Sequence, residues 1–349
     1  MQFEKVKPPI WNLWRDGVTQ SLITKWLQCP VQCELEYVHG WTPIKTSEAL
    51  FFGKIIHYVL EHAYAEEQPP LSGNVESFLT GFKDKIEKQN DNLSTEDFEK
   101  REIIYAKAAG LLKAYFFYFR DDFNYRWWSL EERFKVNGPS GTGIELNGMI
   151  DGAFSKKEKD YNIYLIDHKI LSVINVDNCE LLLPADFQIN FYLYGIRKLL
   201  ASIDPKFKIK GFYYNIIRRP GLKFTKKDGN LRAYEERIFE DILNRPHHYF
   251  CSERNKSASE GAKINESGSR DLFYIPVANE EIDQFEQKQL RPILRDIERW
   301  HESKFKWPGY YNPQALETKY GLAPMTRAIL YKDFSGLYQR PVPFQELEE

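Results

Sequence analysis

The residues most able to do chemistry lie in two short segments near the middle of the chain. The segment YLIDHKI, residues 164–170, places Asp167, His168 and Lys169 inside what otherwise reads as a buried strand. The apolar segment before it, LNGMIDGAF, carries Asp151. Burying charged side chains is costly unless they are paired or hold a metal ion. These residues therefore form either a satisfied ion-pair network at a strand end or a functional site.

The spacing of these residues is compatible with a metal site. Side chains alternate along a strand, so Asp167 and Lys169 should point one way and His168 the other. Neighbouring strands can bring Asp151 beside Asp167, and two carboxylates that close repel unless one is protonated or a cation bridges them. Their oxygens suit Mg²⁺ or Mn²⁺, and a lysine beside them can position a water or stabilise developing charge. Such a set could hydrolyse a phosphodiester bond, although a bare D-x-K tripeptide is more often a surface ion pair.

The elements predicted around these segments make an α/β arrangement with helical additions. Short apolar runs separated by turn residues predict strands over 130–136, 144–154, 161–170 and 207–219. Helical periodicity is found over 51–67, 95–120, 186–203 and 280–303. We expect Asn279 to cap the last of these helices and Pro292 to kink or split it. The first three strands should form a meander, with the helix over 186–203 leading to the fourth.

Composition sets outer limits on the function. The chain has 349 residues, 42% hydrophobic and 28% charged, with four cysteines and a net charge of −2. These values indicate a globular protein rather than a disulfide scaffold, and a non-specific DNA coat would be more basic. No signal peptide or membrane-spanning segment is recognised, so we expect a reducing, intracellular setting. Basic residues available for DNA contact are Lys206, Lys208, Lys210, Arg218, Arg219, Lys223, Lys226 and Lys227.

Four short motifs occur in a fixed order along the chain. They are G-x-x-x-H in GKIIH, G-x-x-D in GMID, D-x-K in DHK and Q-x-x-x-Y in QINFY. Together they resemble the RecB-like branch of the PD-(D/E)XK nuclease superfamily, which includes phage exonucleases and CRISPR-associated RecB-like nucleases. The resemblance spans roughly residues 20–220 and extends more loosely to about 340. It implies a restriction-endonuclease-like core, with a mixed central sheet flanked by helices and helical N- and C-terminal additions.

The resemblance also implies roles for individual residues. His57, Asp151, Asp167 and the carbonyl of His168 match the metal ligands, and Lys169 matches the catalytic lysine. Gln188 and Tyr192 match a pair that reaches the active site from one helix face; otherwise they are ordinary helix surface, and His57 alone would read as a core histidine. Glu132 is a further candidate, because relatives often carry a glutamate on the first strand.

The function implied by the resemblance is a Mg²⁺- or Mn²⁺-dependent DNA nuclease, an exonuclease acting on linear DNA. The alternative is a DNA-binding or recombination-complex subunit with this fold and little cleavage of its own. We expect one nuclease domain over 1–349, with a helical region 1–122, a catalytic core 125–225 and a helical region 226–349. The polar segment 252–271 is predicted to be a mobile loop. The resemblance further implies a bacterial or phage-infected cytoplasm and a possible homo-oligomer or recombination partner.

The cysteines depart from the iron–sulfur members of this branch. Cys29 matches the first cluster ligand of those relatives, but no cysteine follows Cys251. A cluster requires four well-placed ligands. We therefore expect no iron–sulfur cluster, and apolar packing in its place between the N- and C-terminal helices.

Overall fold

The structure of the chain is a computed structural model. It describes residues 10–44, 47–66, 69–70, 72–87, 95–156, 161–172, 182–251, 273–305, 317–318, 321–322, 324–331 and 333–340. The predicted loop at 252–271 and Cys179 lie outside these residues. Among the described helices, none is both long and apolar enough to cross a membrane.

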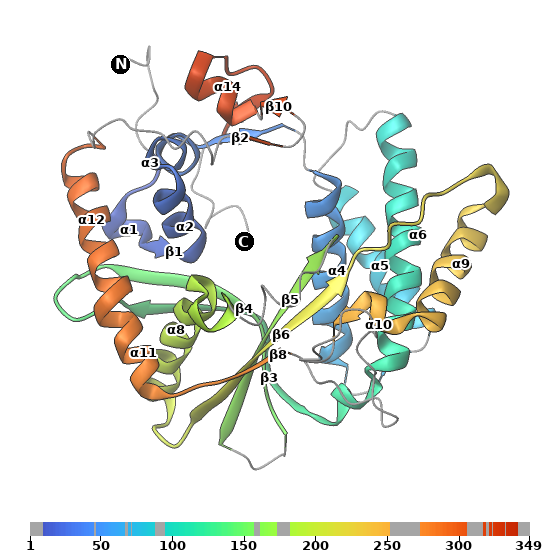
Figure 1. Cartoon of the computed structure of the whole chain (residues 1–349), viewed down its shortest axis with the longest axis horizontal. Coiled ribbons are helices and arrows are strands. Elements are labelled where there is room, and N and C mark those ends of the chain that lie inside the picture. The colour runs from blue at the N-terminus through green and yellow to red at the C-terminus, as the bar shows by residue number, and fades with distance from the viewer. Residues whose placement is uncertain are drawn as a thin grey trace.

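A mixed sheet of seven strands, as far as the chain is described, lies at the centre (Figure 1). Its main strands are β3 (Arg126–Asn137), β4 (Glu145–Ser155), β5 (Asn162–Leu171) and β6 (Lys208–Arg218). The first three pair antiparallel, which confirms the predicted meander, and β6 pairs parallel to β5. Short strands complete the sheet: β1 (Val18–Thr19), β7 (Phe250–Cys251) and β8 (Phe273–Pro276). The α/β class with a mixed central sheet is confirmed.

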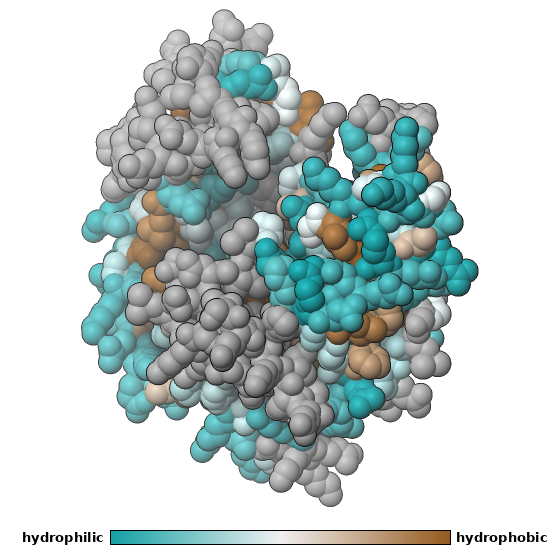
Figure 2. Space-filling view, turned by 45° about the vertical axis from the view of Figure 1, so that its right-hand side comes forward, coloured by the Kyte–Doolittle hydropathy of each residue, from teal (hydrophilic) through white to brown (hydrophobic). Residues whose placement is uncertain are grey.

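Two groups of helices cover the sheet, one on each side of it in Figure 1. One group consists of α4 (Glu48–Ala65), α5 (Ser72–Glu87), α6 (Thr95–Tyr118), α9 (Leu231–Asn244) and α10 (Pro246–Tyr249). The other consists of α1 (Leu13–Asp16), α2 (Gln20–Gln28), α3 (Pro30–Cys33), α8 (Phe187–Ile203), α11 (Asn279–Phe285) and α12 (Arg291–Glu302). Each group packs its own apolar cluster against the strands. In Figure 2, which brings the right-hand side forward, hydrophilic residues predominate and hydrophobic ones form separate patches.

The long C-terminal helix differs in its start from the prediction. Asn279 is the first residue of α11 rather than its cap, and Ala278 occupies the N-cap without a side-chain hydrogen bond. The prediction of an Asn279 cap was therefore wrong. Pro292 does divide the helix: the π-helical turn η5 (Glu286–Leu290) separates α11 from α12, which has this proline in its first turn. A π-helical turn lets the chain continue past a proline that cannot donate a backbone hydrogen bond.

The packing of α8 against the sheet depends on one aromatic ring and two glycines. The Phe134 ring of β3 lies so close to Gly148 of β4 and Gly195 of α8 that a Cβ at either position would fall 2.4 Å or 2.2 Å from it. Only glycine leaves room for this ring without a shift of the backbone. The close approach at these two glycines brings α8 near the strands that carry the acidic residues.

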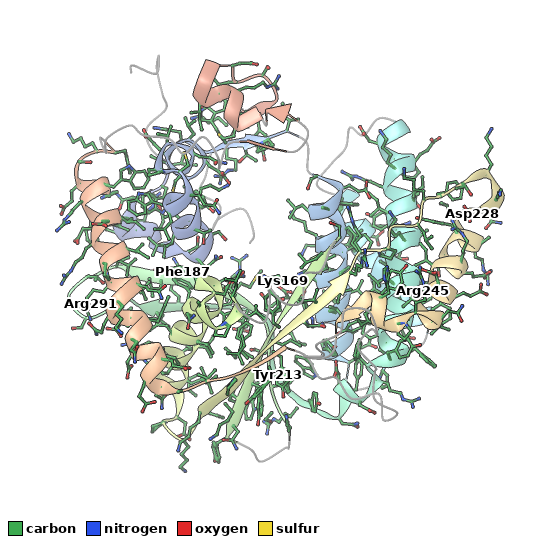
Figure 3. The ribbon with its side chains drawn as sticks, in the orientation of Figure 1. Lys169, Phe187, Tyr213, Asp228, Arg245 and Arg291 are labelled. Carbon is green, nitrogen blue, oxygen red and sulfur yellow. The ribbon has the colours of Figure 1, made fainter. Side chains whose placement is uncertain are left out.

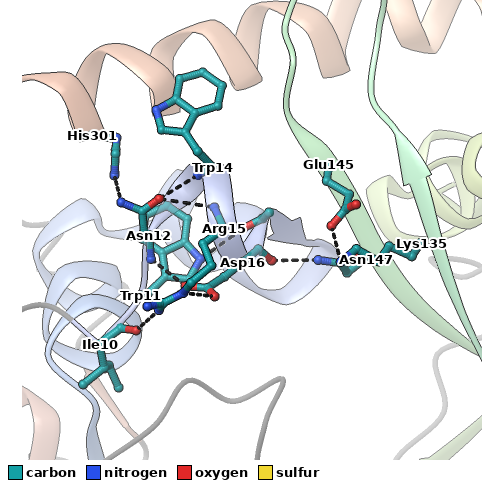
Figure 4. Close-up of polar contacts among 11 residues, drawn as sticks. Ile10, Trp11, Asn12, Trp14, Arg15, Asp16, Lys135, Glu145, Asn147 and His301 are labelled. Atoms are coloured by element: carbon teal, nitrogen blue, oxygen red, sulfur yellow. Dashed lines mark hydrogen bonds and ion pairs between the residues drawn. The ribbon is translucent and has the colours of Figure 1, made fainter.

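The N-terminal segment is tied to both the sheet and α12 (Figure 4). The Nδ2 of Asn147 on β4 donates to the carbonyl of Asp16, 2.7 Å away. The Nδ2 of Asn12 lies 3.3 Å from the Nε2 of His301 on α12. These contacts fix β1 parallel to β4, where two residues of pairing alone would be weak.

A small apolar cluster joins the N- and C-terminal regions. Cys29 is fully buried in it, and the other buried members are Leu35, Met325, Ala328, Ile329 and Leu337. The strand β2 (Trp41–Pro43) pairs with β11 (Leu337–Gln339) beside it, and α14 (Pro324–Tyr331) covers it. The Nη2 of the buried Arg340 donates to the carbonyl of Glu36, 2.6 Å away. Apolar packing and backbone pairing thus connect the two ends of the chain at this point.

Candidate metal centre and active site

The acidic residues lie where two strands separate. The ladder between β4 and β5 ends at the pair Gly152 and Ile166. Beyond it, the carboxylate of Asp151 replaces the ladder and accepts the backbone N–H of His168 at 2.5 Å. On the same stretch of β5, Lys169 Nζ lies 2.8 Å from Oδ2 of Asp167, so these two side chains share a face as predicted. The two strands thus separate at the point where Asp151, Asp167 and Lys169 lie.

Three possible metal ligands converge beside this gap. The Nδ1 of His57, on α4, lies 3.0 Å from Oε1 of Glu131 and 3.5 Å from Oδ2 of Asp151. One ligand atom from each of the three lies within 4.8 Å of the others. Two hard carboxylate oxygens and one imidazole suit Mg²⁺, Mn²⁺ or a related divalent ion. The structure thus brings His57 and Asp151 together and adds an acid, Glu131, that we had not singled out.

The glutamate at this site is Glu131, where the sequence favoured Glu132. Glu131 has a left-handed backbone with φ of 46°, and it lies opposite Asp151 because its neighbours Leu130 and Glu132 pair with Gly152 and Ile150. Strict alternation would put Leu130 and Phe134 on one face, yet they pack in different apolar clusters. The choice of Glu132 rested on the resemblance, in which relatives often carry a glutamate on the first strand, and the left-handed residue places Glu131 at the site instead. Such a conformation costs about 1–3 kcal/mol outside glycine and is concentrated at functional sites.

This correction gives a matched pair of variants on adjacent residues. We expect Glu131→Gln to weaken Mn²⁺ binding by about tenfold or more, because a neutral amide is a poorer ligand than a carboxylate. Glu132→Gln should bind the ion as the wild type does. Calorimetric titration with Mn²⁺ measures both, and equal affinities for the two variants would contradict the placement of Glu131 at the site.

The electrostatics of the group reflect three acids and two cations in close contact. Burial lowers the pKa of His57, but Asp151 and Glu131 outweigh it and raise that pKa to about 9. Burial and the nearby Asp167 raise the pKa of Asp151 to about 7, against the opposite effect of His57. For Lys169 the effect of burial is outweighed by Asp167, which raises the pKa of the ammonium. Lys169 is therefore a cation here, placed to stabilise negative charge rather than to accept a proton.

The predicted pair on α8 also reaches the site. Figure 3 shows Lys169 near the middle of the molecule and Phe187, the first residue of α8, to its left. The next residue, Gln188, donates from Nε2 to the hydroxyl of Tyr192, one turn further along α8, at 3.0 Å. Burial first, and then the charge of Asp167, raise the pKa of Tyr192, so its hydroxyl stays protonated. Gln188 and Tyr192 are thus uncharged hydrogen-bonding groups facing the acids.

Comparison with known families agrees with this geometry. The model of the PD-(D/E)XK nuclease superfamily matches residues 18–310, which is most of the chain. The chain belongs to the PD-(D/E)XK nuclease superfamily. No curated protein matches it. Members of this superfamily are nucleases that use divalent metal ions.

The structure also contains a hydrogen-bond network that no sequence motif predicts. It is a buried chain of hydrogen bonds that ends on His168. Tyr64 donates to Oδ2 of Asp122 at 2.7 Å, and the hydroxyl of Tyr115 lies 3.1 Å from that of Tyr64. The amide of Asn215 donates to Tyr115 at 3.0 Å and lies 2.6 Å from Nδ1 of His168.

The direction of these bonds sets the state of the histidine ring. Tyr64 gives its only proton to Asp122, so Tyr115 donates to Tyr64 and accepts from Asn215. The other amide proton of Asn215 then points to Nδ1 of His168, which accepts it. Burial and the nearby cations lower the pKa of His168 well below its usual value, so the ring is neutral. The network fixes the peptide of His168, whose N–H meets Asp151 and whose carbonyl is a candidate ligand.

Asp122, at the other end of the network from His168, should make the stability of the fold depend on pH. Burial raises the pKa of Asp122 to about 7, partly offset by the bond from Tyr64. In an unfolded chain the pKa of an aspartate is about 3.9, so folding raises the pKa of Asp122. The protonated carboxyl therefore stabilises the fold fully below about pH 3.9, and this contribution to the free energy of unfolding is lost as the pH rises through about 7. Relative to the wild type, Asp122→Asn should gain roughly 2–4 kcal/mol in free energy of unfolding between about pH 4 and pH 8.

Urea unfolding at each pH measures this difference. The matched control is Asp121→Asn, one residue away, for which Tyr64 is not a partner. Parallel stability curves for Asp122→Asn and the wild type over this range would show that Asp122 is ionised throughout and would refute the prediction.

Proposed function

We propose that this chain is a DNA exonuclease of the RecB-like branch that works with Mg²⁺ or Mn²⁺. The observation that carries the proposal is the convergence of His57, Glu131 and Asp151 beside the Asp167–Lys169 pair. A DNA-binding domain has no use for a buried lysine among carboxylates, whereas phosphodiester hydrolysis needs both ligands and a cation.

The residues fit a divalent ion on chemical grounds. The oxygens come from short carboxylates on β3 and β4, and Oδ2 of Asp167 is buried and receives no hydrogen bond from the described residues. Its contact with Lys169 is an ion pair at 2.8 Å. We assign His57, Glu131, Asp151, Asp167 and the His168 carbonyl as the ligand set. When bound there, the ion would lower the pKa of a coordinated water and offset the charge of the phosphate.

The side chains of this protein supply the remaining functions. Asp167 holds the Lys169 ammonium, which faces the phosphate and stabilises the charge that develops on it. Asp151 holds the peptide of His168 through its N–H. Gln188 and Tyr192 offer neutral donors that can position the phosphodiester without repelling it.

Exonuclease action on DNA is the finer part of the proposal, and it is supported by the four ordered motifs that resemble the RecB-like branch. A time course on end-labelled linear and on circular DNA, single- and double-stranded, with Mn²⁺ or Mg²⁺, tests it. Progressive shortening of linear DNA with intact circles is the expected result. Cleavage of circles would make the chain an endonuclease instead.

The second candidate function is a DNA-binding or recombination-complex subunit with little cleavage. It would bind DNA in the same assay and leave all substrates uncut. The presence of Lys169 beside Asp167 favours catalysis over this alternative. A homo-oligomeric state, a recombination partner, a cytoplasmic location and a single domain over 1–349 stay predictions of the resemblance.

A further inference from the structure

A polar cavity opens where β5 and β6 end. Its volume is about 380 Å³, and its walls include Ser172 after β5, Arg218 and Arg219 at the end of β6, and residues of α4, α6 and α10. This volume is within the range of about 300–1,000 Å³ typical of small-ligand sites. The cavity shares no lining residue with the acidic site.

The lining is strongly basic. It holds a single carboxylate, Glu48, and the following cations: Lys107, Arg218, Arg219, Lys223 and Arg245. Arg245 is neutralised by Asp241, with 2.6 Å between Nη2 and Oδ2. Two cations share the carboxylate of Glu48: its Oε1 lies 3.5 Å from Nη1 of Arg219 and 3.7 Å from Nζ of Lys107. Positive charge therefore exceeds negative charge in the cavity.

Two of these cations are held in positions that an anion would stabilise. The side chain of Lys107 is only 12% exposed, and burial, with a contribution from Arg219, lowers the pKa of its ammonium. Arg218 donates from Nε to the carbonyl of Ser172 and places Nη1 2.9 Å from Nε2 of His248. Within the described residues, no carboxylate forms an ion pair with Arg218. The cavity thus presents more charge-assisted donors than carboxylate acceptors.

Two elements link this cavity to the acidic site. Ser172, the first residue after β5, lies three residues beyond Lys169, a distance of about 10 Å along an extended chain. On α4, Glu48 lies nine residues before His57, a distance of about 13 Å along a helix. Figure 3 agrees in placing Lys169 near the middle and Arg245 in the helical layer beside it. The separation corresponds to about two phosphate positions of a strand, because adjacent phosphates lie about twice as far apart as the rise of about 3.4 Å along the duplex axis.

We propose that this basic cavity binds a phosphate group of the substrate strand, about two positions from the bond that is cleaved. The phosphate is either an internal phosphodiester or the phosphate at a strand end. This inference rests on the proposed nuclease function for the identity of its ligand, while the anion site itself can be tested alone.

The first test uses inorganic phosphate as the probe. Phosphate binding to the folded chain should raise its melting temperature by mass action. The variant is Lys107→Gln/Arg219→Gln, which leaves no buried carboxylate unpaired because Glu48 is 55% exposed. The control is Arg232→Gln, which removes an 87% exposed cation outside this cavity. The shift should persist in the control and vanish in the double variant; an equal shift in all three would overturn the anion site.

The second test uses short oligonucleotides that end in phosphate or hydroxyl, in an Asp167→Asn background with Ca²⁺. We expect the double variant to bind about tenfold or more weakly, and each lost phosphate contact to reduce the log–log salt slope by about 0.7–0.9. A loss confined to phosphate-ended strands identifies a terminal phosphate, and an equal loss on both identifies an internal one. Unchanged affinity and slope would overturn the proposal for DNA. If the double variant does not fold, the exposed Lys223→Gln replaces it.

The two proposals fail separately. If inorganic phosphate raises the melting temperature of the wild type but the protein neither binds nor cuts DNA, the anion site stands and the proposed nuclease function is refuted. If the wild type and the double variant cut DNA equally well and with the same salt dependence, the nuclease proposal stands and the proposed role of this cavity is refuted.

Discussion

Lys169→Gln should lower the rate of DNA cleavage by about a hundredfold to ten-thousandfold while leaving Mn²⁺ binding in place. The reason is that the ammonium of Lys169 is paired with Asp167 at 2.8 Å and is not among the ligands that converge on His57. Removing it takes a fixed cation from the phosphate without taking a ligand from the ion. Single-turnover cleavage and calorimetry on the same preparation measure the two effects.

The control for this variant is Lys135→Gln, which removes a 64% exposed lysine from β3. It should cut and bind Mn²⁺ as the wild type does. Lys169→Arg retains the charge and should recover part of the rate, which separates loss of charge from loss of packing. Wild-type cleavage by Lys169→Gln would exclude the lysine from the chemistry and reduce the D-x-K segment to a structural ion pair.

Asp151→Asn should lose both cleavage and Mn²⁺ affinity, with affinity falling by about a hundredfold. Asp151 contacts His57 and the His168 peptide at once, so its carboxylate joins the ligands from α4 to those on β5. In EDTA the same variant should be at least as stable as the wild type, because it removes one of three acids that repel one another. Thermal melts with EDTA and with Mn²⁺ report both effects.

A suitable control is Glu145→Gln, which removes a carboxylate from the same strand, where its partner is Lys135. The wild type and this control should gain thermal stability on addition of Mn²⁺, and Asp151→Asn should not. A Mn²⁺-dependent increase in Asp151→Asn as large as that of the wild type would place the ion elsewhere.

The part of the site that could be predicted is the part encoded locally. Asp167 and Lys169 share a strand and are two residues apart, so alternation alone places them together. His57 and Asp151 were found because short motifs surround them. Glu131 was missed because its face depends on one left-handed residue, which no propensity of glutamate foretells.

The network behind His168 could not be predicted for a different reason. Asp122, Tyr64, Tyr115 and Asn215 come from four separate elements, and their meeting depends on how α4 and α6 pack on β6. Tertiary packing of this kind has no sequence period to reveal it. The short strands β1, β7 and β8 were missed similarly, since runs of two to four residues acquire their pairing from the longer strands beside them.

The division of the ligands between two layers has an energetic consequence. His57 belongs to α4, whose apolar face is part of the helical core, whereas Glu131 and Asp151 belong to the sheet. Any ligand that bridges them must also hold the helical layer against the strands. Metal occupancy and the rigidity of the interface between the two layers are therefore linked. A change that loosens α4 should weaken the affinity of the site for the metal ion.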